Sequence, residues 1–212
     1  RTSSIWVMPA ILMISKSQDD FRFESSTDLN DLQHHIENGD TDLAVASLDL
    51  IKCTPELFTE FIGKIENRFV MRAGHPLSFV NDVTIEDLRH YPLVGDYVPR
   101  EQADFIEGNP GRLGMVDHDT GILKAAMTVK STHDVIDVLE QSDGVARLPA
   151  DITAQGLKSG RIVEIKTKTL IPKPIEIYAI GRQSQRHLPN IQSFLTAMQA
   201  VEHTRQPLMT GA

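Results

Sequence analysis

The feature of this sequence that most constrains its fold is a regular alternation of short apolar runs and amphipathic stretches, separated by turn residues. Residues 21–24 alternate like a β-strand, residues 28–38 carry apolar side chains at helical spacing, and residues 42–46 form a nearly continuous apolar run. Gly39 stands where a helix C-cap is expected. Because a strand, a helix and a strand follow within about 25 residues, we predict a parallel βαβ unit and an α/β fold.

The rest of the chain continues this alternation. A capping-box pattern at residues 84–88 predicts a short helix, Ser131 is expected to cap a second, and apolar steps from residue 188 to 201 predict a last one. Strands are expected at residues 57–71 (as one or two), 93–95, 127–130, 144–149, 161–165 and 175–180. The pattern indicates two units, with a passage between them near residues 94–99.

Composition excludes several classes of protein. The net charge is −8, and no cluster of Lys and Arg offers the basic surface that nucleic-acid phosphates require. The single cysteine, Cys53, excludes an intramolecular disulfide and a Cys-rich zinc site. The apolar run at residues 5–14 contains Pro9, lacks a cleavage site, and is shorter than the ~20 residues of a membrane span. We therefore expect neither secretion nor membrane insertion.

Several short segments resemble catalytic or metal-binding motifs without completing them. Residues 117–121 have the opening of a calcium loop, but Thr128 stands where its bidentate Glu belongs. The Gly-rich residues 108–114 do not link a strand to a helix, so they predict no phosphate-binding loop. His34 and His35 lack the Glu-x-x-His arrangement of a zinc site. We therefore expect no catalytic residue, no metal and no cofactor.

Hydroxyl side chains are the remaining candidates for a functional site, because they stand where helices begin or an apolar strand ends. They are Ser3, Ser4, Ser47, Ser131 and Thr132. In an open parallel sheet, ligands bind beyond the carboxyl ends of the strands, where helix N-termini present free N–H groups. N-capping alone explains a residue such as Ser131 without any ligand. Their occurrence in both units favours a cleft.

Four segments carry a resemblance to a known family. They are NGDTDLAV at 38–45, RAGHPL at 72–77, VTIEDL followed by YPLV within 83–94, and GVARLP at 144–149. In order and spacing they resemble the effector-binding domain of LysR-type transcriptional regulators. Each segment is short, and their succession across residues 38–149 is what makes the resemblance specific.

The resemblance implies a type II periplasmic-binding-protein-like fold, in which two α/β lobes are joined by two crossover strands. The boundaries expected from it are lobe one at 1–93 and 177–203, lobe two at 94–176, a frayed tail at 204–212, and crossovers at 93–96 and 175–180. The family's N-terminal winged helix-turn-helix is absent from this sequence, so DNA contact is expected only through that part.

In this family lobe one also begins with a strand before its first helix, whereas this sequence starts at that helix. Either the strand lies upstream or the sequence is cut inside the lobe, and the second case would put the loop at residues 2–4 in doubt as a site. Arg147 replaces a usually apolar residue and is expected to face the cleft or solvent.

The resemblance also implies a function. The chain is expected to be the regulatory domain of a cytoplasmic DNA-binding regulator, not an enzyme, and to sense a small molecule by closure of its lobes. A homodimer through the flat sides of the lobes is expected, with a tetramer of the full-length protein as the larger alternative. The runner-up function is the solute-binding component of a transporter, which shares the fold and would need a leader or a lipid anchor.

The predicted cleft has a defined composition. Its expected lining residues are Ser3, Ser4 and Ser47 from lobe one, Ser131 and Thr132 from lobe two, and Tyr97 beside the crossover. Because helix N-termini carry about half a positive charge and hydroxyl groups donate hydrogen bonds, the favoured effector is a carboxylate or another small anion.

Overall fold

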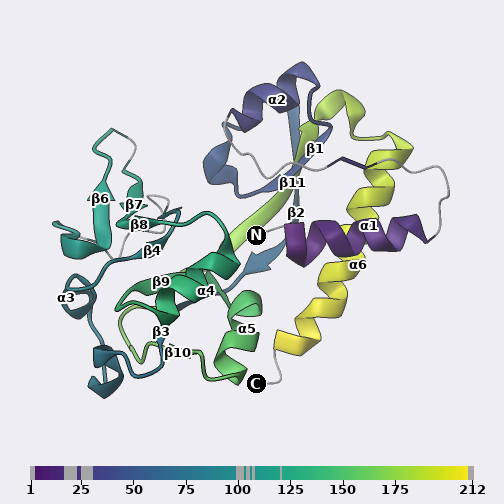
Figure 1. Ribbon diagram of the computed structural model, residues 1–212. Coiled ribbons are helices and arrows are strands. Elements are labelled where there is room, and N and C mark those ends of the chain that lie inside the picture. The colour runs from purple at the N-terminus through teal and green to yellow at the C-terminus, as the bar shows by residue number, and fades with distance from the viewer. Residues whose placement is uncertain are drawn as a thin grey trace. The chain divides into compact units, whose positions relative to one another are not determined.

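The computed structural model describes residues 3–16, 23–24, 31–98, 103, 106, 108–119 and 121–209. Its helices and strands form two compact units (Figure 1). The first unit consists of Arg1–Ile65 together with Ile175–Ala212, and the second is Glu66–Pro174. The second unit is therefore inserted between the two segments of the first.

The first unit is built on a three-stranded sheet in the order β1–β11–β2. Its elements are a π-helical turn (Ser3–Val7), α1 (Met8–Ser15), α2 (Leu32–Asn38), β1 (Leu43–Ala46), β2 (Leu57–Ile65), β11 (Ile175–Arg182) and α6 (Pro189–Met209). Both β1 and β2 run antiparallel to β11, with Ala44 opposite Ile180 and Ile65 opposite Ile175.

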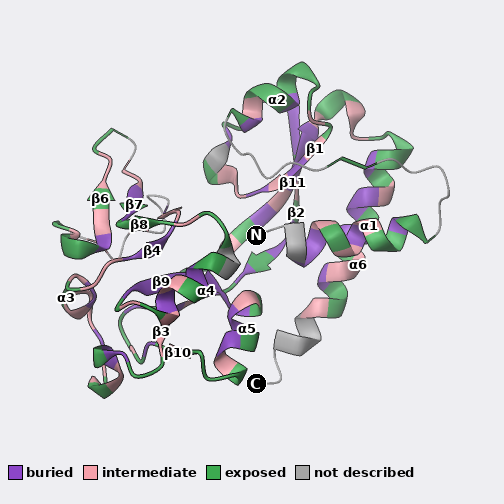
Figure 2. Ribbon diagram, viewed as in Figure 1, coloured by how far each residue is buried: buried purple, intermediate pink, exposed green. Residues whose placement is uncertain are grey.

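Helices cover both faces of this sheet, because successive strand residues point to opposite sides. Val45 faces the cluster formed with α1 and α6, whereas Ala44 and Ala46 face the cluster formed with α2. The large buried side chains of the first cluster include Trp6, Phe58, Ile62, Ile177, Phe194 and Met198. Figure 2 shows buried residues concentrated on the strands and exposed residues on the outer turns of α2. The first unit therefore has three layers.

The second unit contains the sheets β10–β3–β9, β4–β8 and β5–β7–β6. Its strands are β3 (Asn67–Arg72), β4 (Val94–Gly95), β5 (Tyr97–Val98), β6 (Gly114–Val116), β7 (Leu123–Ala125), β8 (Met127–Thr128), β9 (Val145–Pro149) and β10 (Ile162–Glu164). Its helices are α3 (Ile85–Leu88), α4 (Thr132–Glu140) and α5 (Ala150–Lys158). A parallel bridge between Leu93 and Val145 links β9 to the strand β4, which runs parallel to β8.

Strands β3 and β9 separate two apolar clusters of the second unit. Phe69 and Val145 belong to the cluster that includes α3, whereas Val70 and Ala146 belong to the cluster that includes α4. Since these residues alternate along paired antiparallel strands, odd and even positions line opposite faces. The sheet is thus buried on both sides, as its nearly continuous apolar sequence indicates.

Local signals placed several helix ends correctly. At the start of α3, the Thr84 N–H donates to Asp87 Oδ2 (2.9 Å) and the Asp87 N–H donates to Thr84 Oγ1 (3.4 Å), which completes the predicted capping box. Ser131 caps α4 by accepting from the Asp134 N–H. Gly39 ends α2 with a φ of 91°, a left-handed conformation that glycine adopts without steric cost. These predictions are confirmed.

The predicted boundary between the two units differs from the observed one. The sequence placed the first passage at residues 93–96, but the units change over between Ile65 and Glu66. Only Glu66 separates β2 from β3, and the two strands pair with different sheets. An apolar run does not reveal a change of pairing partner, so residues 57–71 read as strand structure within one unit. The second change falls between Pro174 and Ile175, against the expected 176/177.

Among the described residues, β1 has an antiparallel partner in place of the parallel one predicted for a βαβ unit. Strand β1 exists where it was expected, but its partner is β11, to which it runs antiparallel. Burial along β1 alternates accordingly, with only Ala44 and Ala46 fully buried. Of the expected strand at residues 21–24, only residues 23 and 24 are described, and they lie outside any strand.

The predicted frayed tail at residues 204–212 is wrong for the residues that the structure describes there. Helix α6 continues to Met209, because its last turns are anchored by side chains. Arg205 donates to Glu202 Oε2 (2.8 Å) and to the Lys64 carbonyl (3.0 Å), and its guanidinium lies 4.9 Å from the Trp6 ring centroid. The Trp6 indole N–H also donates to Glu202 Oε2 (2.8 Å). Residues 210–212 lie outside the described part.

Candidate functional site

The parallel pair β4 and β8 brings three of the predicted site residues to one edge of the second unit. Gly95 pairs with Thr128, and the Val129 N–H donates to the Gly95 carbonyl (2.7 Å). The carboxyl ends of parallel strands meet at the same edge, which is where open α/β sheets bind ligands. Tyr97 follows the end of β4, and α4 with its cap Ser131 follows the end of β8.

Ser131 is an exposed N-cap. Its hydroxyl oxygen accepts from the Asp134 N–H (3.4 Å), and Asp134 also places a carboxylate in the first turn of α4. Thr132 is the first residue of the helix, and the placement of its side chain lies outside the described part. The N-terminus of α4 presents backbone N–H groups with a partial positive charge, to which a ligand anion could bind.

Tyr97 lies in the short strand β5, which pairs antiparallel with β7. Its pairing partner is Lys124, and its side chain is half-buried. Lys124 forms an ion pair with Asp117 (3.7 Å). Tyr97 therefore lies opposite a charged residue, immediately after the edge formed by β4 and β8.

The predicted residues of the first unit are in different surroundings. Ser47 directly follows β1 and caps the 3-10 turn Leu48–Leu50, accepting from the Asp49 N–H (3.4 Å) and donating to Asp49 Oδ2 (2.9 Å). Its hydroxyl is thus already engaged in local hydrogen bonds. Ser3 and Ser4 begin the π-helical turn that leads into α1, and their side chains lie outside the described part. That these residues share one site with Ser131 stays a prediction.

Two buried polar residues of the second unit, Arg147 and Asn67, were not predicted as site residues. Arg147 was noted only as a departure from the family pattern; its side chain is buried and donates to the Lys173 carbonyl (3.2 Å). Asn67 is 6% exposed, and neither of its amide atoms has a hydrogen-bond partner within the part of the chain that the structure describes. The only signal in the sequence was that Asn67 and Arg147 interrupt otherwise apolar strands. Polar residues in a strand are ordinarily interpreted as facing solvent.

His75 is a third buried polar residue, held by hydrogen bonds on both ring nitrogens. Nδ1 accepts from the Leu77 N–H (3.1 Å), and Nε2 donates to the Asp143 carbonyl (3.2 Å). The Tyr91 ring packs edge-on at 4.5 Å between centroids. Burial lowers the pKa of His75 below its ordinary value, although the neighbouring Asp143 acts in the opposite direction. The imidazole is therefore a neutral structural group.

The part of the chain that the structure describes holds neither a metal-binding cluster nor a membrane-spanning helix. No three His, Cys, Asp or Glu side chains lie grouped there so as to hold a metal ion. Among the helices of that part, none has both the length and the apolar character needed to cross a membrane.

Comparison with known proteins identifies the class of the fold. The regulatory domain of MetR, a LysR family regulator from N. meningitidis, is similar with a TM-score of 0.71 and 18% identity, covering 94% of this chain and 88% of that one. A transcriptional regulator from Vibrio parahaemolyticus is similar with a TM-score of 0.67 and 13% identity, over 95% of this chain and 92% of that one. Oxidized OxyR from Corynebacterium glutamicum is similar with a TM-score of 0.66 and 14% identity, over 98% of this chain and 63% of that one. The fold is the two-lobed, periplasmic-binding-protein-like α/β fold.

The family follows from the sequence model that matches residues 2–202, described as the LysR substrate binding domain. The chain belongs to this family. It is a small-molecule-sensing regulatory domain, and the transporter alternative is not favoured. Regulators of this family bind small-molecule effectors and act as oligomers, and their effector domains are regulatory rather than enzymatic. No curated protein matches the chain.

Proposed function

We propose that this domain binds a small anionic effector at the edge where β4 and β8 end. The observation that carries the proposal is the parallel pairing of Gly95 with Thr128, which places Tyr97 and the N-terminus of α4 beyond adjacent carboxyl ends. Ser131 and Thr132 would contact the effector from this side. The contribution of the first unit would come from Ser3, Ser4 and Ser47.

An anion suits this edge for electrostatic reasons. The first N–H groups of α4 have no partner inside the helix, and the helix dipole adds about half a positive charge there. Asp134 offsets part of this charge, so the hydroxyl groups at the helix start would supply the remaining donors. Each hydrogen bond to a charged group contributes roughly 1.5–3 kcal/mol.

The effector would act by shifting a population of conformations. A ligand that gains contacts only when the two units close on it stabilises the closed state by its difference in affinity for the two states. In the full-length protein, this shift would change the arrangement of attached DNA-binding domains. The full-length protein would act in the cytoplasm, contact DNA only through its N-terminal domain, and catalyse no reaction.

The substitution Thr132→Val tests the effector site. A thermal-shift screen of small carboxylates first identifies a stabilising ligand, and calorimetry then measures its affinity. We expect Thr132→Val to weaken binding about tenfold, the equivalent of ~1.4 kcal/mol, because it removes one hydroxyl donor. Thr204→Val, which removes the exposed hydroxyl that donates to the Ala200 carbonyl in α6, serves as the control with unchanged affinity. Unchanged affinity in Thr132→Val would contradict the site.

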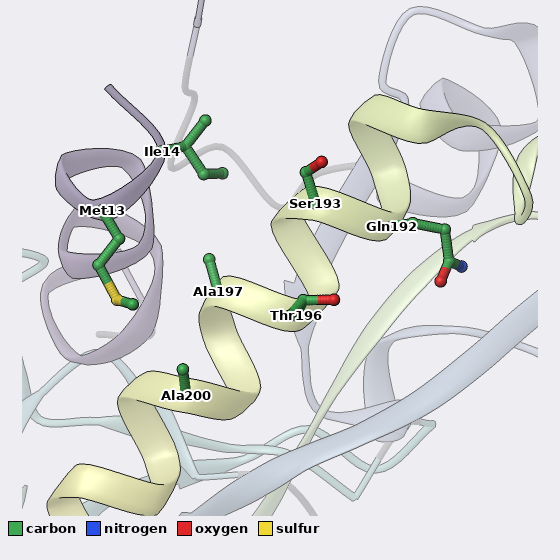
Figure 3. Close-up of a pocket in the computed structure, with 7 residues that line it drawn as sticks. All are labelled: Met13, Ile14, Gln192, Ser193, Thr196, Ala197 and Ala200. Carbon is green, nitrogen blue, oxygen red and sulfur yellow. The ribbon is translucent and has the colours of Figure 1, made fainter. Parts of the chain in front are cut away.

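We also propose a homodimer through α1 and the adjoining side of α6. The apolar stripe from Leu188 to Val201, on which the sequence prediction relied, begins one residue before α6. It is mostly covered within the first unit, and Leu188 is its exposed large apolar residue. Helix α1 instead exposes Met8, Leu12 and Met13. Met13 and Ile14 of α1 line an open hollow of about 430 Å³ together with residues of α6. Figure 3 shows these side chains on the two helices. The lining residues on α6 are Gln192, Ser193, Thr196, Ala197 and Ala200.

Small side chains on α6 would let a helix of the second copy approach closely, while the exposed apolar residues of α1 would be removed from water. Leu12→Glu should shift a dimer to the monomer mass of 23.6 kDa, because it places a charge in the interface. Light scattering across a concentration series measures this, with Phe79→Glu in the second unit as the control. A monomer mass for the unsubstituted chain at all concentrations would contradict the dimer. A tetramer would form only in the full-length protein.

A further inference from the structure

The only tryptophan of the sequence, Trp6, ties the turn Ser3–Val7 to the last turns of α6. Its side chain is fully buried, and the indole N–H donates to Glu202 Oε2 at 2.8 Å. The guanidinium group of Arg205 lies 4.9 Å from the centroid of the Trp6 ring. Glu202 and Arg205 are one helical turn apart and pair with each other at 2.8 Å, so they hold Trp6 together.

The same ion pair also contacts the end of β2. Both terminal nitrogens of Arg205 donate to the Lys64 carbonyl, Nη1 at 3.1 Å and Nη2 at 3.0 Å. The Glu202 carboxylate lies directly on the backbone of the preceding residue of β2, since a Cβ atom on Gly63 would be 2.6 Å from Glu202 Cδ. The pair therefore connects Trp6 with the backbone of β2 at two consecutive residues.

The end of β2 is also where the chain leaves the first unit. The chain leaves that unit after Ile65 and re-enters it at Ile175, and we call these two places the unit connections. The two residues are opposite each other in the register of β2 and β11. Lys64, one residue before the first connection, places its Nζ 3.0 Å from Glu176 Oε1 of β11. The Lys64 backbone is therefore expected to follow a change of direction at either connection.

A buried ion pair is a costly way to fasten a helix. The side chains of Arg205 and Glu202 are only 12% and 11% exposed, so both charges have lost most of their hydration. Apolar side chains of similar size often stabilise a fold equally well or better. Hydrogen bonds, in contrast, depend on distance and angle, and they weaken steeply when the acceptor turns. A small rotation of the Lys64 carbonyl therefore alters the position of Arg205, and with it the surroundings of Trp6.

We propose that Glu202 and Arg205 are positioning residues that transmit a movement of the unit connections to the turn Ser3–Val7. The inference rests on the proposed function, in which effector binding shifts the arrangement of the two units, and it names residues that carry this shift. They act through Lys64 and Trp6, without contacting the effector. In the full-length protein, a displacement of Trp6 is passed on toward the N-terminal DNA-binding domain.

Hydrogen exchange of the Trp6 indole proton tests this relay without any ligand. Glu66 is exposed and directly follows β2, so Glu66→Gly loosens the first unit connection while it keeps the carbonyl that accepts from the Ala150 N–H. In the 15N-labelled 212-residue chain, Glu66→Gly should raise the exchange rate of the indole proton at least about threefold. In Arg205→Met, which lacks the bonds to Lys64, the same change should raise that rate less than about 1.5-fold.

Three further variants complete the experiment. Thr59→Gly gives the same freedom to an exposed position of β2 away from the connection, so it should change the exchange rate by one factor whether or not Arg205 is present. Lys64→Met removes the ammonium group but keeps the carbonyl, so the effect of Glu66→Gly should persist in it. If Arg205→Met is unfolded in thermal denaturation, Arg205→Lys takes its place. An ammonium group keeps the positive charge but lacks the planar fork that puts two nitrogens on one carbonyl.

Two outcomes would overturn the proposal. One is that Glu66→Gly leaves the exchange rate of the Trp6 indole proton unchanged in the otherwise unsubstituted chain. The other is that Glu66→Gly raises that rate by the same factor in Arg205→Met, which is the result expected of a merely structural anchor. A carboxylate that binds and loses affinity in Thr132→Val would in either case leave the proposed function standing. A screen without any binding compound would remove the proposed function, while the exchange rates would still decide whether the relay exists.

Discussion

At the residue scale, His75 shows how burial fixes a protonation state. Its Nδ1 accepts from a backbone N–H, and its Nε2 donates to the Asp143 carbonyl, so the folded chain holds the neutral ring. Arg72, paired with Asp143 at 2.7 Å, adds a positive charge nearby that also opposes protonation. The pKa of His75 is therefore lower in the folded chain than in the unfolded one.

This difference predicts how stability depends on pH. Below an ordinary histidine pKa of about 6.5, the unfolded chain binds a proton that the folded chain does not, so the free energy of unfolding falls as the pH falls. Above that pH, His75 is neutral in both the folded and the unfolded chain, so its full contribution to the free energy of unfolding is present. Urea unfolding between pH 5 and 7.5 should show a smaller decrease in His75→Asn, which keeps an acceptor for the Leu77 N–H but does not titrate. The exposed His90→Asn is the control, and equal slopes in both variants would refute the assignment.

At the scale of elements, helix α2 depends on a side chain from a distant strand. It has seven residues, too few to be stable alone. Arg182 of β11 donates to the Ile36 carbonyl (2.6 Å) at its C-terminus and pairs with Asp42 (3.1 Å). A cation at this position also interacts favourably with the helix dipole. Strand β11 therefore determines where α2 ends as much as the left-handed Gly39 does.

Arg182→Met should lower the free energy of unfolding by roughly 1–3 kcal/mol, because it leaves the Ile36 carbonyl at the end of α2 without its charged donor. The matched control is Arg186→Met, whose more exposed side chain pairs with Glu60 at 3.7 Å and should matter by less than about 0.5 kcal/mol. Urea unfolding measures both variants. If both variants lost a similar amount of free energy of unfolding, Arg182 would contribute only as a surface charge.

At the scale of the whole molecule, the two units differ in how the chain builds them. The second is a single segment, Glu66–Pro174, with apolar clusters of its own, whereas the first needs β11 and α6 from the end of the chain. In the first unit, β1 and β2 do not pair with each other; both pair with β11. The sheet of the first unit therefore forms only with strand β11, which follows the whole second unit in the sequence.

The segment 66–174 should consequently fold by itself, as a segment of ordinary domain size with its own core does. Expressed alone, it should show a cooperative thermal transition and a dispersed amide spectrum. The segment 1–65 should show neither, because it lacks the central strand of its sheet. A folded 1–65, or an unfolded 66–174, would contradict this account of how the two units are divided.

The sequence by itself determined what depends on nearby residues. The capping box of Thr84 and Asp87, the cap at Ser131 and the end of α2 at Gly39 involve groups within three or four positions, so their spacing predicts their geometry. The ordered apolar motifs were sufficient to indicate the family and the fold. Hydroxyl residues at a predicted helix start directed attention to Ser131, Thr132 and the edge beyond β8.

Tertiary structure alone decided what depends on partners far along the chain. Nothing near β1 specifies β11 as its antiparallel partner, and nothing near Glu66 marks the change of sheet, because strand pairing is non-local. The same holds for Trp6 and Glu202, which the fold joins by a hydrogen bond although 196 positions separate them. A polar residue gains a role of this kind only when the fold has buried it beside its partner, since burial is what makes an unmatched polar group costly.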